Sequence, residues 1–299
     1  MRKLTAICTL IRPHEWVKNL FVFAPAVFSG RLLDPDVAAA SIMAWAFFCA
    51  ASSFVYIFND LVDAERDRQH PAKQRRPIPS GAVTRFEAAV LAVYCFLVVQ
   101  LAALHVMPLW AVLNTYLASG ILYSLYLKRK VIVDVLVIAI GFVLRVLAGA
   151  AVIDVMPSEW LILCTFLLAT FLGFSKRRHE LTQLGDSARQ HRWVLTLYSP
   201  EFLDQMNLIT ITLTLTCYIF YTIAPETIAR FGTRHLLYSV LLVMLGLFRY
   251  LFMVHKRGKG SPVEVLYTDR QIVLITLLWL LYMVWFIYDW PVVKTWLRG

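Results

Sequence analysis

Residues 59–67 of the chain read Asn-Asp-Leu-Val-Asp-Ala-Glu-Arg-Asp, and they lie where a long apolar segment runs out. The spacing puts Asp60, Asp63 and Asp67 at positions i, i+3 and i+7, within about 60° of arc on an α-helix, with Asn59 beside them. Carboxylates so close together repel one another, and a carboxylate near a bilayer is costly to keep ionised. The cluster therefore indicates a site for a divalent cation.

The residue types in this stretch also indicate which cation it binds. Oxygen ligands on one helix face suit Mg²⁺, which keeps several waters and usually bridges to substrate phosphates. We therefore expect Asp60, Asp63, Asp67 and Asn59 to be metal ligands, and Asp60, Asp63 and Asn59 to be catalytic. The stretch is typical of a membrane enzyme that handles a diphosphate.

The composition supports a membrane protein. Of the 299 residues, 60% are hydrophobic and 16% are charged, which is too apolar for a soluble protein of this size. The apolar segments are nearly continuous and no linker separates two halves, so we expect one domain over residues 1–299. The predicted fold class is all-α, a polytopic bundle of about nine transmembrane helices. Candidate spans, each needing roughly 20 apolar residues, are 18–33, 38–60, 85–105, 108–127, 132–152, 158–175, 205–223, 235–254 and 271–290.

The positive charge sets the expected orientation. The net charge of +10 would fit a nucleic-acid partner, but in a membrane protein it is better explained by basic cytoplasmic loops. Most Lys and Arg residues lie at one set of span ends, which predicts a cytoplasmic N-terminus and cytoplasmic loops over 61–84 and 176–204. The opposite ends carry only Arg31, Arg230, Arg234, Lys294 and Arg298. The five cysteines are scattered without a CxxC pair, so neither disulfides nor a thiolate metal site is expected.

A basic run follows the aspartates. Lys73, Arg75 and Arg76 lie within a few residues of the carboxylates, and a Mg-diphosphate site needs such cations for the oxygens that the metal leaves free. An ordinary positive-inside loop with acids capping a helix is the alternative. However, the helix dipole disfavours Asp at a helix C-terminus, so three of them there need another explanation.

These residues carry a resemblance. The string NDLVDAERD matches the NDxxDxxxD motif of the UbiA superfamily of intramembrane prenyltransferases, at the expected cytoplasmic end of the second span. The segments RPHEWVKN (residues 12–19) and RRPIPSG (75–81) also resemble this superfamily. The resemblance covers essentially the whole chain.

The second polar loop departs from the usual pattern of that superfamily. Its aromatic prenyltransferases carry another aspartate-rich motif after the sixth span, whereas this chain reads KRRHEL over residues 176–181. Together with LRVLAGA (144–150), this segment resembles the decaprenyl-phosphate phosphoribosyltransferase branch. A positive-inside loop again remains the alternative.

The branch resemblance implies two substrates, 5-phosphoribosyl diphosphate as donor and a polyprenyl phosphate as acceptor. They bring a diphosphate, a 5-phosphate and a lipid phosphate into one pocket, so more cations are needed. Arg145 lies within a span and pairs either with an acid or with bound substrate, while Tyr126 lines the pocket or belongs to the interfacial aromatic belt. The expected substrate-binding residues are Lys18, Lys73, Arg75, Arg76, Tyr126, Arg145, Lys176, Arg177, Arg178 and Glu180.

The same resemblance implies a bacterial inner membrane protein with its active site facing the cytoplasm. It further implies a product that feeds decaprenylphosphoryl-arabinose and cell-wall arabinan synthesis, and it is compatible with a homo-oligomer. An aromatic prenyltransferase stays open as an alternative, although the missing second aspartate motif argues against it. A transporter also stays open, but transporters place charge near the bilayer midplane, whereas here it gathers at one interface.

Overall fold

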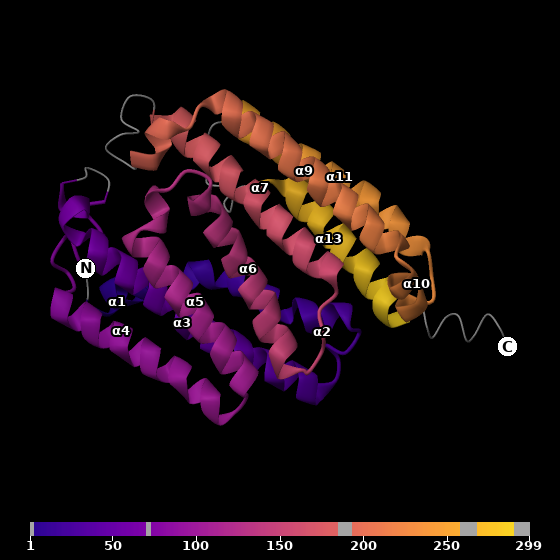
Figure 1. Ribbon diagram of the computed structural model, residues 1–299, viewed down its shortest axis with the longest axis horizontal. Helices are drawn as coiled ribbons and strands as arrows, with labels where there is room; N and C mark the ends of the chain where they lie inside the picture. The colour runs from indigo at the N-terminus through magenta and orange to yellow at the C-terminus, as the bar shows by residue number, and fades with distance from the viewer. Residues whose placement is uncertain (1–2, 70–72, 185–192, 258–267, 290–299) are drawn as a thin grey trace. The chain divides into compact units, whose positions relative to one another are not determined.

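The computed structural model describes residues 3–69, 73–184, 193–257 and 268–289 (Figure 1). Helices and short connections make up all of these segments, and no strand occurs in them. Seven of the helices are long and apolar enough to cross a membrane. The all-α, multi-pass prediction is therefore confirmed, with nine as an approximate count. The predicted orientation stays a prediction.

The chain forms two compact units, residues 1–157 and 158–299, and each is described here by itself. The single-domain expectation stays a prediction. The first unit contains α1 (Lys3–Ile11), η1 (Pro13–Phe23), α2 (Ala24–Phe28), α3 (Pro35–Arg68), α4 (Arg85–Gln100), η2 (Leu101–Leu104), α5 (Met107–Leu125), η3 (Leu127–Arg129) and α6 (Val133–Val152).

Helix α3 carries the aspartate motif. It begins at a favourable cap, because the Asp34 carboxylate accepts from the backbone N–H of Asp36 and Pro35 occupies the first turn. Its 34 residues extend about 50 Å at the α-helical rise, whereas a bilayer's hydrocarbon core is about 30 Å thick. The helix is therefore long enough for its last turns, which include residues 59–67, to project beyond the core.

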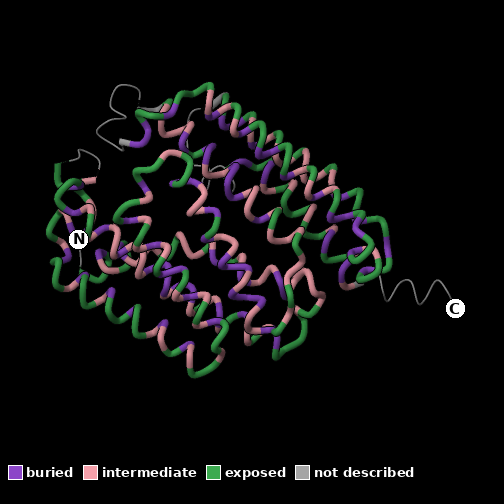
Figure 2. Tube along the Cα trace, viewed as in Figure 1, coloured by how far each residue is buried: buried purple, intermediate pink, exposed green. Residues whose placement is uncertain are grey.

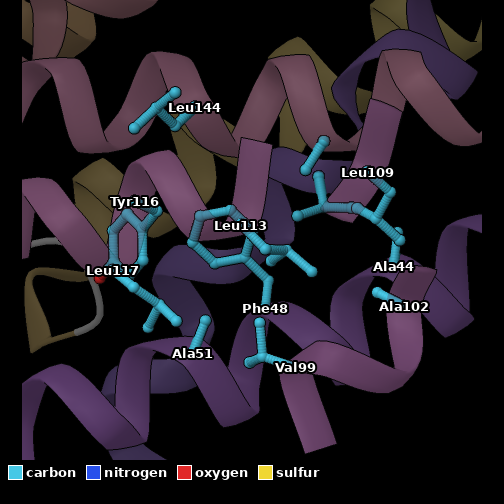
Figure 3. Close-up of a cluster of buried hydrophobic side chains, with 12 residues drawn as sticks. Ala44, Phe48, Ala51, Val99, Ala102, Leu109, Leu113, Tyr116, Leu117 and Leu144 are labelled. Carbon is cyan, nitrogen blue, oxygen red and sulfur yellow. The ribbon is translucent and has the colours of Figure 1, made fainter. Parts of the chain in front are cut away.

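An apolar cluster fixes α3 against its neighbours (Figure 3). Phe48 of α3 packs with Leu113 and Tyr116 of α5 and with Leu144 of α6. Helix α4 packs on α3 through one stripe, and its other faces are largely exposed (Figure 2). That stripe contains Ala88, Ala92, Cys95 and Val99, at the spacing of one helix face.

The first predicted span, 18–33, is wrong as a single transmembrane helix. The 3₁₀ helix η1 covers its first part, the five-residue α2 follows, and the chain then turns at Gly30, whose φ is 74°. Each of the two helices has a proline in its first turn, Pro13 in η1 and Pro25 in α2, and η1 packs on α3 and α6. Helix α5 occupies the predicted 108–127 span. It is not among the seven helices that are apolar enough to cross a membrane, because residues such as Asn114 and Thr115 lower its hydropathy.

The second unit also consists of helices joined by short connections. It contains α7 (Glu159–Leu184), η5 (Trp193–Leu197), α9 (Pro200–Ile223), α10 (Pro225–Phe231), η6 (His235–Tyr238), α11 (Ser239–Arg257), α13 (Arg270–Val284) and the π-helical η7 (Trp285–Asp289). Buried Phe171, Ile211, Tyr250 and Ile272 hold α7, α9, α11 and α13 together. Ser199 caps α9 and Asp269 caps α13, each through a side-chain oxygen.

Candidate active site

The three aspartates of the motif lie on one face of the last turns of α3, as the spacing predicts. Asp60 and Asp67 are buried, with 3% and 2% of their surface exposed, and Asp63 is half-buried. A buried carboxylate is costly unless a cation or several hydrogen bonds compensate it. Each of the three contacts a cation that another segment of the first unit supplies.

Asp60 is held from the N-terminal segment. The Arg12 Nη2 donates to both Asp60 oxygens at 2.7 and 2.8 Å, and the Arg76 Nη1 donates to Oδ1 at 3.3 Å. The Arg12 guanidinium lies 5.1 Å from the centre of the Tyr56 ring. Burial lowers the pKa of Arg12, but the charge and hydrogen bonds of Asp60 more than offset this, so the pKa lies above its ordinary value.

Asp67 is held from the loop that follows α3. Its Oδ2 accepts from the Arg76 Nη1 at 2.7 Å, and the Lys73 Nζ lies 3.9 Å from Oδ1. The loop itself is fixed because Ile78 and Val83 pack against Ile57 and Ala64 of α3. Its backbone closes on itself through the Ser80 N–H to Arg76 carbonyl bond. Arg76 therefore bridges Asp60 and Asp67 from an anchored position.

Asp63 is held from the far end of α5. The Lys128 Nζ in η3 donates to the two Asp63 oxygens at 2.7 and 2.8 Å and to the Asn59 Oδ1 at 3.2 Å. Lys128 is only 5% exposed. Each of the four predicted metal ligands thus accepts a hydrogen bond from the side chain of an Arg or a Lys.

The donor set fits Mg²⁺, because carboxylate and amide oxygens on one helix face are what this ion takes. In the residues that the structure describes, no three acidic, His or Cys side chains lie close enough together to hold a metal ion. The aspartate oxygens are held by Arg12, Arg76 and Lys128 instead. A metal bound here would compete with these cations for the carboxylate oxygens.

The other predicted cations of the first unit lie in different settings. Lys18 is half-buried and pairs with Glu15 of the same short helix. Arg75 precedes Arg76 and is exposed, and Tyr126 is 65% exposed at the end of α5. Their contact with substrate stays a prediction.

Arg145 pairs with neutral groups in the positions that the structure gives it. The side chain is 4% exposed and donates to the Asn19 Oδ1 at 2.9 Å, the Gly141 carbonyl at 2.7 Å and the Tyr116 hydroxyl at 3.3 Å. The rings of Phe48, Tyr116 and Phe142 surround its guanidinium at about the distances of cation–π contacts. None of these hydrogen-bond partners is an acid, and a substrate contact, the other predicted alternative, stays a prediction.

The KRRHEL segment lies on α7 in the second unit. Arg177 is buried and its Nη1 donates to Glu180 at 2.6 Å, while Arg178 pairs with Asp204 of α9. Lys176 is exposed. These four predicted substrate-binding residues are therefore partly engaged with acids of their own unit, and their substrate role stays a prediction.

Sequence reasoning missed two residues that contact the aspartates, Arg12 and Lys128. Arg12 belongs to the RPHEWVKN segment, but nothing in that segment names Asp60 as its partner. Lys128 begins the run Lys-Arg-Lys over residues 128–130, and nothing in that run distinguishes it from an ordinary basic loop. A signal was available in charge balance, because three clustered carboxylates near a membrane need more compensation than one neighbouring loop supplies.

Comparisons with known proteins find relatives over most of the chain. The family model "UbiA prenyltransferase family" matches residues 19–268. A decaprenyl-phosphate phosphoribosyltransferase of Mycolicibacterium smegmatis is 29% identical over 293 residues, covering 93% of this chain and 91% of the relative. The protein of that name from Corynebacterium glutamicum is 26% identical, covering 94% and 86%. A protoheme IX farnesyltransferase of Ruthia magnifica is 27% identical over 253 residues, covering 83% and 73%.

Solved structures give the same fold. A UbiA homologue of Archaeoglobus fulgidus bound to GPP and Mg²⁺ aligns with a TM-score of 0.70 at 18% identity, over 94% of this chain and 98% of that one. A digeranylgeranylglyceryl phosphate synthase aligns with a TM-score of 0.66 at 17% identity, over 96% and 99%. The family match over most of the chain, the helical fold and the NDLVDAERD face of α3 lead to one conclusion: the chain belongs to the UbiA prenyltransferase family.

Proposed function

We propose that this protein transfers the 5-phosphoribosyl group from 5-phosphoribosyl diphosphate to a polyprenyl phosphate, releasing diphosphate. The observation that carries the proposal is the charge at the end of α3, where four cations contact three carboxylates. Such a site has a surplus of positive charge for a polyanion once a metal neutralises the acids. Relatives named decaprenyl-phosphate phosphoribosyltransferase, matched over more than nine-tenths of the chain, support the choice of donor and acceptor.

The aspartate face is the proposed metal site. Asp60 and Asp63 would hold Mg²⁺, with Asn59 and Asp67 as further ligands, directly or through water. When bound, the ion supplies neutralising charge for the diphosphate and makes it a better leaving group. The chain's own cations then bind the diphosphate oxygens that the metal does not contact.

Lys73, Arg75 and Arg76 bind diphosphate oxygens in this proposal. They stabilise the negative charge that grows on the leaving group as the bond between C1 of the ribose and its oxygen breaks. The cations Lys18, Lys176, Arg177 and Arg178 serve the donor's 5-phosphate and the lipid phosphate. Glu180, which accepts from Arg177, is a further proposed substrate-binding residue. Arginine suits that task because its planar fork binds two phosphate oxygens at once.

The acceptor explains why no strong base is needed. A phosphate oxygen of the lipid is already anionic, and it attacks C1 from the face opposite the departing diphosphate, so the anomeric centre inverts. The new C–O bond forms as the old one breaks, and no proton is removed from the nucleophile. An activated Ser, Cys or Thr is therefore unnecessary.

The proposal extends to the setting of the reaction. We place the protein in the bacterial inner membrane, with the aspartates at the cytoplasmic interface and the isoprenoid tail in lipid. The product would feed decaprenylphosphoryl-arabinose and cell-wall arabinan synthesis, and a homo-oligomer in the bilayer is compatible with this proposal.

The test uses the purified full chain in detergent, with Mg²⁺, decaprenyl phosphate and radiolabelled 5-phosphoribosyl diphosphate. Label should move into the organic phase, and EDTA should abolish the transfer. Asp60→Asn should lower the rate at least about 100-fold, since it removes a metal ligand. Glu65→Gln is the matched control, because Glu65 is an exposed acid on the same helix and pairs with Arg68 and Arg85 rather than with a residue of the aspartate face.

An aromatic prenyltransferase is the second candidate, favoured by the similarity to a protoheme IX farnesyltransferase. The same preparation is offered a prenyl diphosphate with haem or 4-hydroxybenzoate. Prenyl transfer without phosphoribosyl transfer would replace the first proposal with this one.

A further inference from the structure

The Lys128 ammonium occupies the place that a metal would need. It lies 2.7 and 2.8 Å from the two Asp63 oxygens and 3.2 Å from the Asn59 Oδ1, the same atoms that are the predicted metal ligands. Lys128 is 5% exposed, so this contact is largely shielded from water. It comes from η3, 65 residues further along the chain than Asp63.

Lys128 competes with a divalent cation for these oxygens, because its ammonium donates to both oxygens of Asp63 and to the Asn59 Oδ1. Two cations a few ångströms apart also repel strongly in a poorly solvated site. Binding of a metal at Asp63 is therefore expected to weaken or replace the contact between Lys128 and the carboxylate.

The same relationship holds one turn earlier on α3. Arg12 makes two contacts to Asp60 at 2.7 and 2.8 Å, and it also comes from a distant segment. Asp63 is thus compensated by Lys128, and Asp60 by Arg12 and Arg76. Displaced cations need a new anion, and a diphosphate entering with the metal provides one.

We propose that Lys128 is an exchanging counter-ion: it holds Asp63 and Asn59 in the metal-free protein, releases them to the metal, and then binds a diphosphate oxygen. This inference rests on the part of the proposed function that puts a metal and a diphosphate at the aspartates, and it is independent of which lipid accepts the sugar. Lys128 opposes binding of the metal alone and favours binding of the diphosphate. Metal and diphosphate are therefore coupled, each strengthening the binding of the other.

The experiment measures two binding constants on the full chain in detergent, without turnover. Mn²⁺ alone replaces Mg²⁺ as a probe, and its free concentration is followed by electron paramagnetic resonance. Radiolabelled inorganic diphosphate is then titrated by equilibrium dialysis at a fixed free Mg²⁺ concentration. In Lys128→Met, Mn²⁺ should bind about tenfold more tightly and diphosphate about tenfold more weakly than in the wild type.

The opposite changes in Mn²⁺ affinity and diphosphate affinity distinguish the exchange from other roles of Lys128. A structural role for Lys128 would weaken both constants, and a role as a phosphate ligand alone would leave Mn²⁺ binding unchanged; either result overturns the proposal. Lys130→Met is the matched control, because Lys130 is an exposed cation of the same loop. Equal effects in the two variants would mean that net charge, rather than the contact, is responsible, and would also overturn it.

Two further results keep the outcomes distinct. Lys128→Gln keeps a hydrogen-bond donor without the charge, and it must shift both constants in the same directions as Lys128→Met if the latter does not fold. If the wild type binds no Mn²⁺ even with diphosphate present, the aspartate site of the proposed function fails. If it binds both but Lys128→Gln changes neither, the exchange alone fails.

Discussion

Arg12 donates from one nitrogen to both carboxylate oxygens of Asp60, across 48 residues of sequence. Its backbone has φ 53° and ψ 60°, the left-handed region, which costs a residue with a side chain about 1–2 kcal/mol. Pro13 follows directly and begins η1. The ion pair therefore joins a strained point of the N-terminal segment to the end of α3, and it offsets part of that strain.

Removing this pair should destabilise the metal-free protein. Arg12→Ala is expected to lower the stability by about 1–3 kcal/mol, because Asp60 then keeps only its contact with Arg76. Thermal unfolding in detergent with EDTA measures the change. In the double variant Arg12→Ala/Asp60→Asn the loss should be smaller than the sum of the single losses, and strict additivity would contradict a direct interaction. Lys3→Ala is the control, since Lys3 pairs with Glu87 at an exposed position and should change nothing measurable.

Arg145 is expected to act mainly through the N-terminal segment. It holds the Asn19 Oδ1, while the Asn19 amide donates to Ser52 of α3 at 3.1 Å, so one network ties η1 to α3 and α6. Arg145→Met should lower the stability by about 1–3 kcal/mol, because it leaves buried acceptors without donors. Asn19→Ala should lose much of the same energy, and the two losses should not add. A lower affinity for 5-phosphoribosyl diphosphate with an unchanged unfolding temperature would instead support the predicted substrate contact.

The sequence allowed the α3 site face to be predicted because helical periodicity is local: Asp60, Asp63 and Asp67 share a face whatever the rest of the chain does. Seven of the predicted spans follow for the same reason, since each is a continuous apolar run. The first span failed where Pro25 and Gly30 interrupt a run of mainly apolar residues. The partners Arg12 and Lys128 could not be predicted, because they depend on which distant segments the packing of α3, α5 and η1 brings to the motif.

Asp269 gives a stability that depends on pH. Its pKa lies below its ordinary value of 3.8, first because Arg249 donates to its carboxylate; burial opposes this, and the Ile272 backbone N–H adds to it. A carboxyl group with a lowered pKa stabilises the folded protein at pH values above its ordinary pKa, and that stability is lost as the pH falls through the lower, folded-state pKa.

The variant Asp269→Asn can still cap α13 but loses the charge. We expect the wild type to unfold at a higher temperature than this variant at neutral pH, and the gap to close below about pH 4. A gap that stays constant down to about pH 3 would contradict the ion pair as its source.

Gly149 of α6 lies in close contact with the backbone of η1. A Cβ atom at this position would lie 1.8 Å from the Val22 carbonyl oxygen, and a backbone atom cannot move aside as a flexible side chain can. Gly149→Ala should therefore lower the free energy of unfolding by at least about 2 kcal/mol, because η1 must shift away from α6 and the Asn19–Arg145 contact must stretch.

Gly141→Ala on the same helix is the matched control. Its Cβ would meet its nearest neighbours at 3.5 Å, so the substitution should be neutral or stabilising by about 0.5–1 kcal/mol. Thermal unfolding of both variants measures the difference, and equal unfolding temperatures would show that η1 does not pack on α6 at this distance. Because η1 follows Arg12 directly, the Gly149 variant should also weaken the hold on Asp60, and its unfolding temperature should respond less than the wild type's to Arg12→Ala.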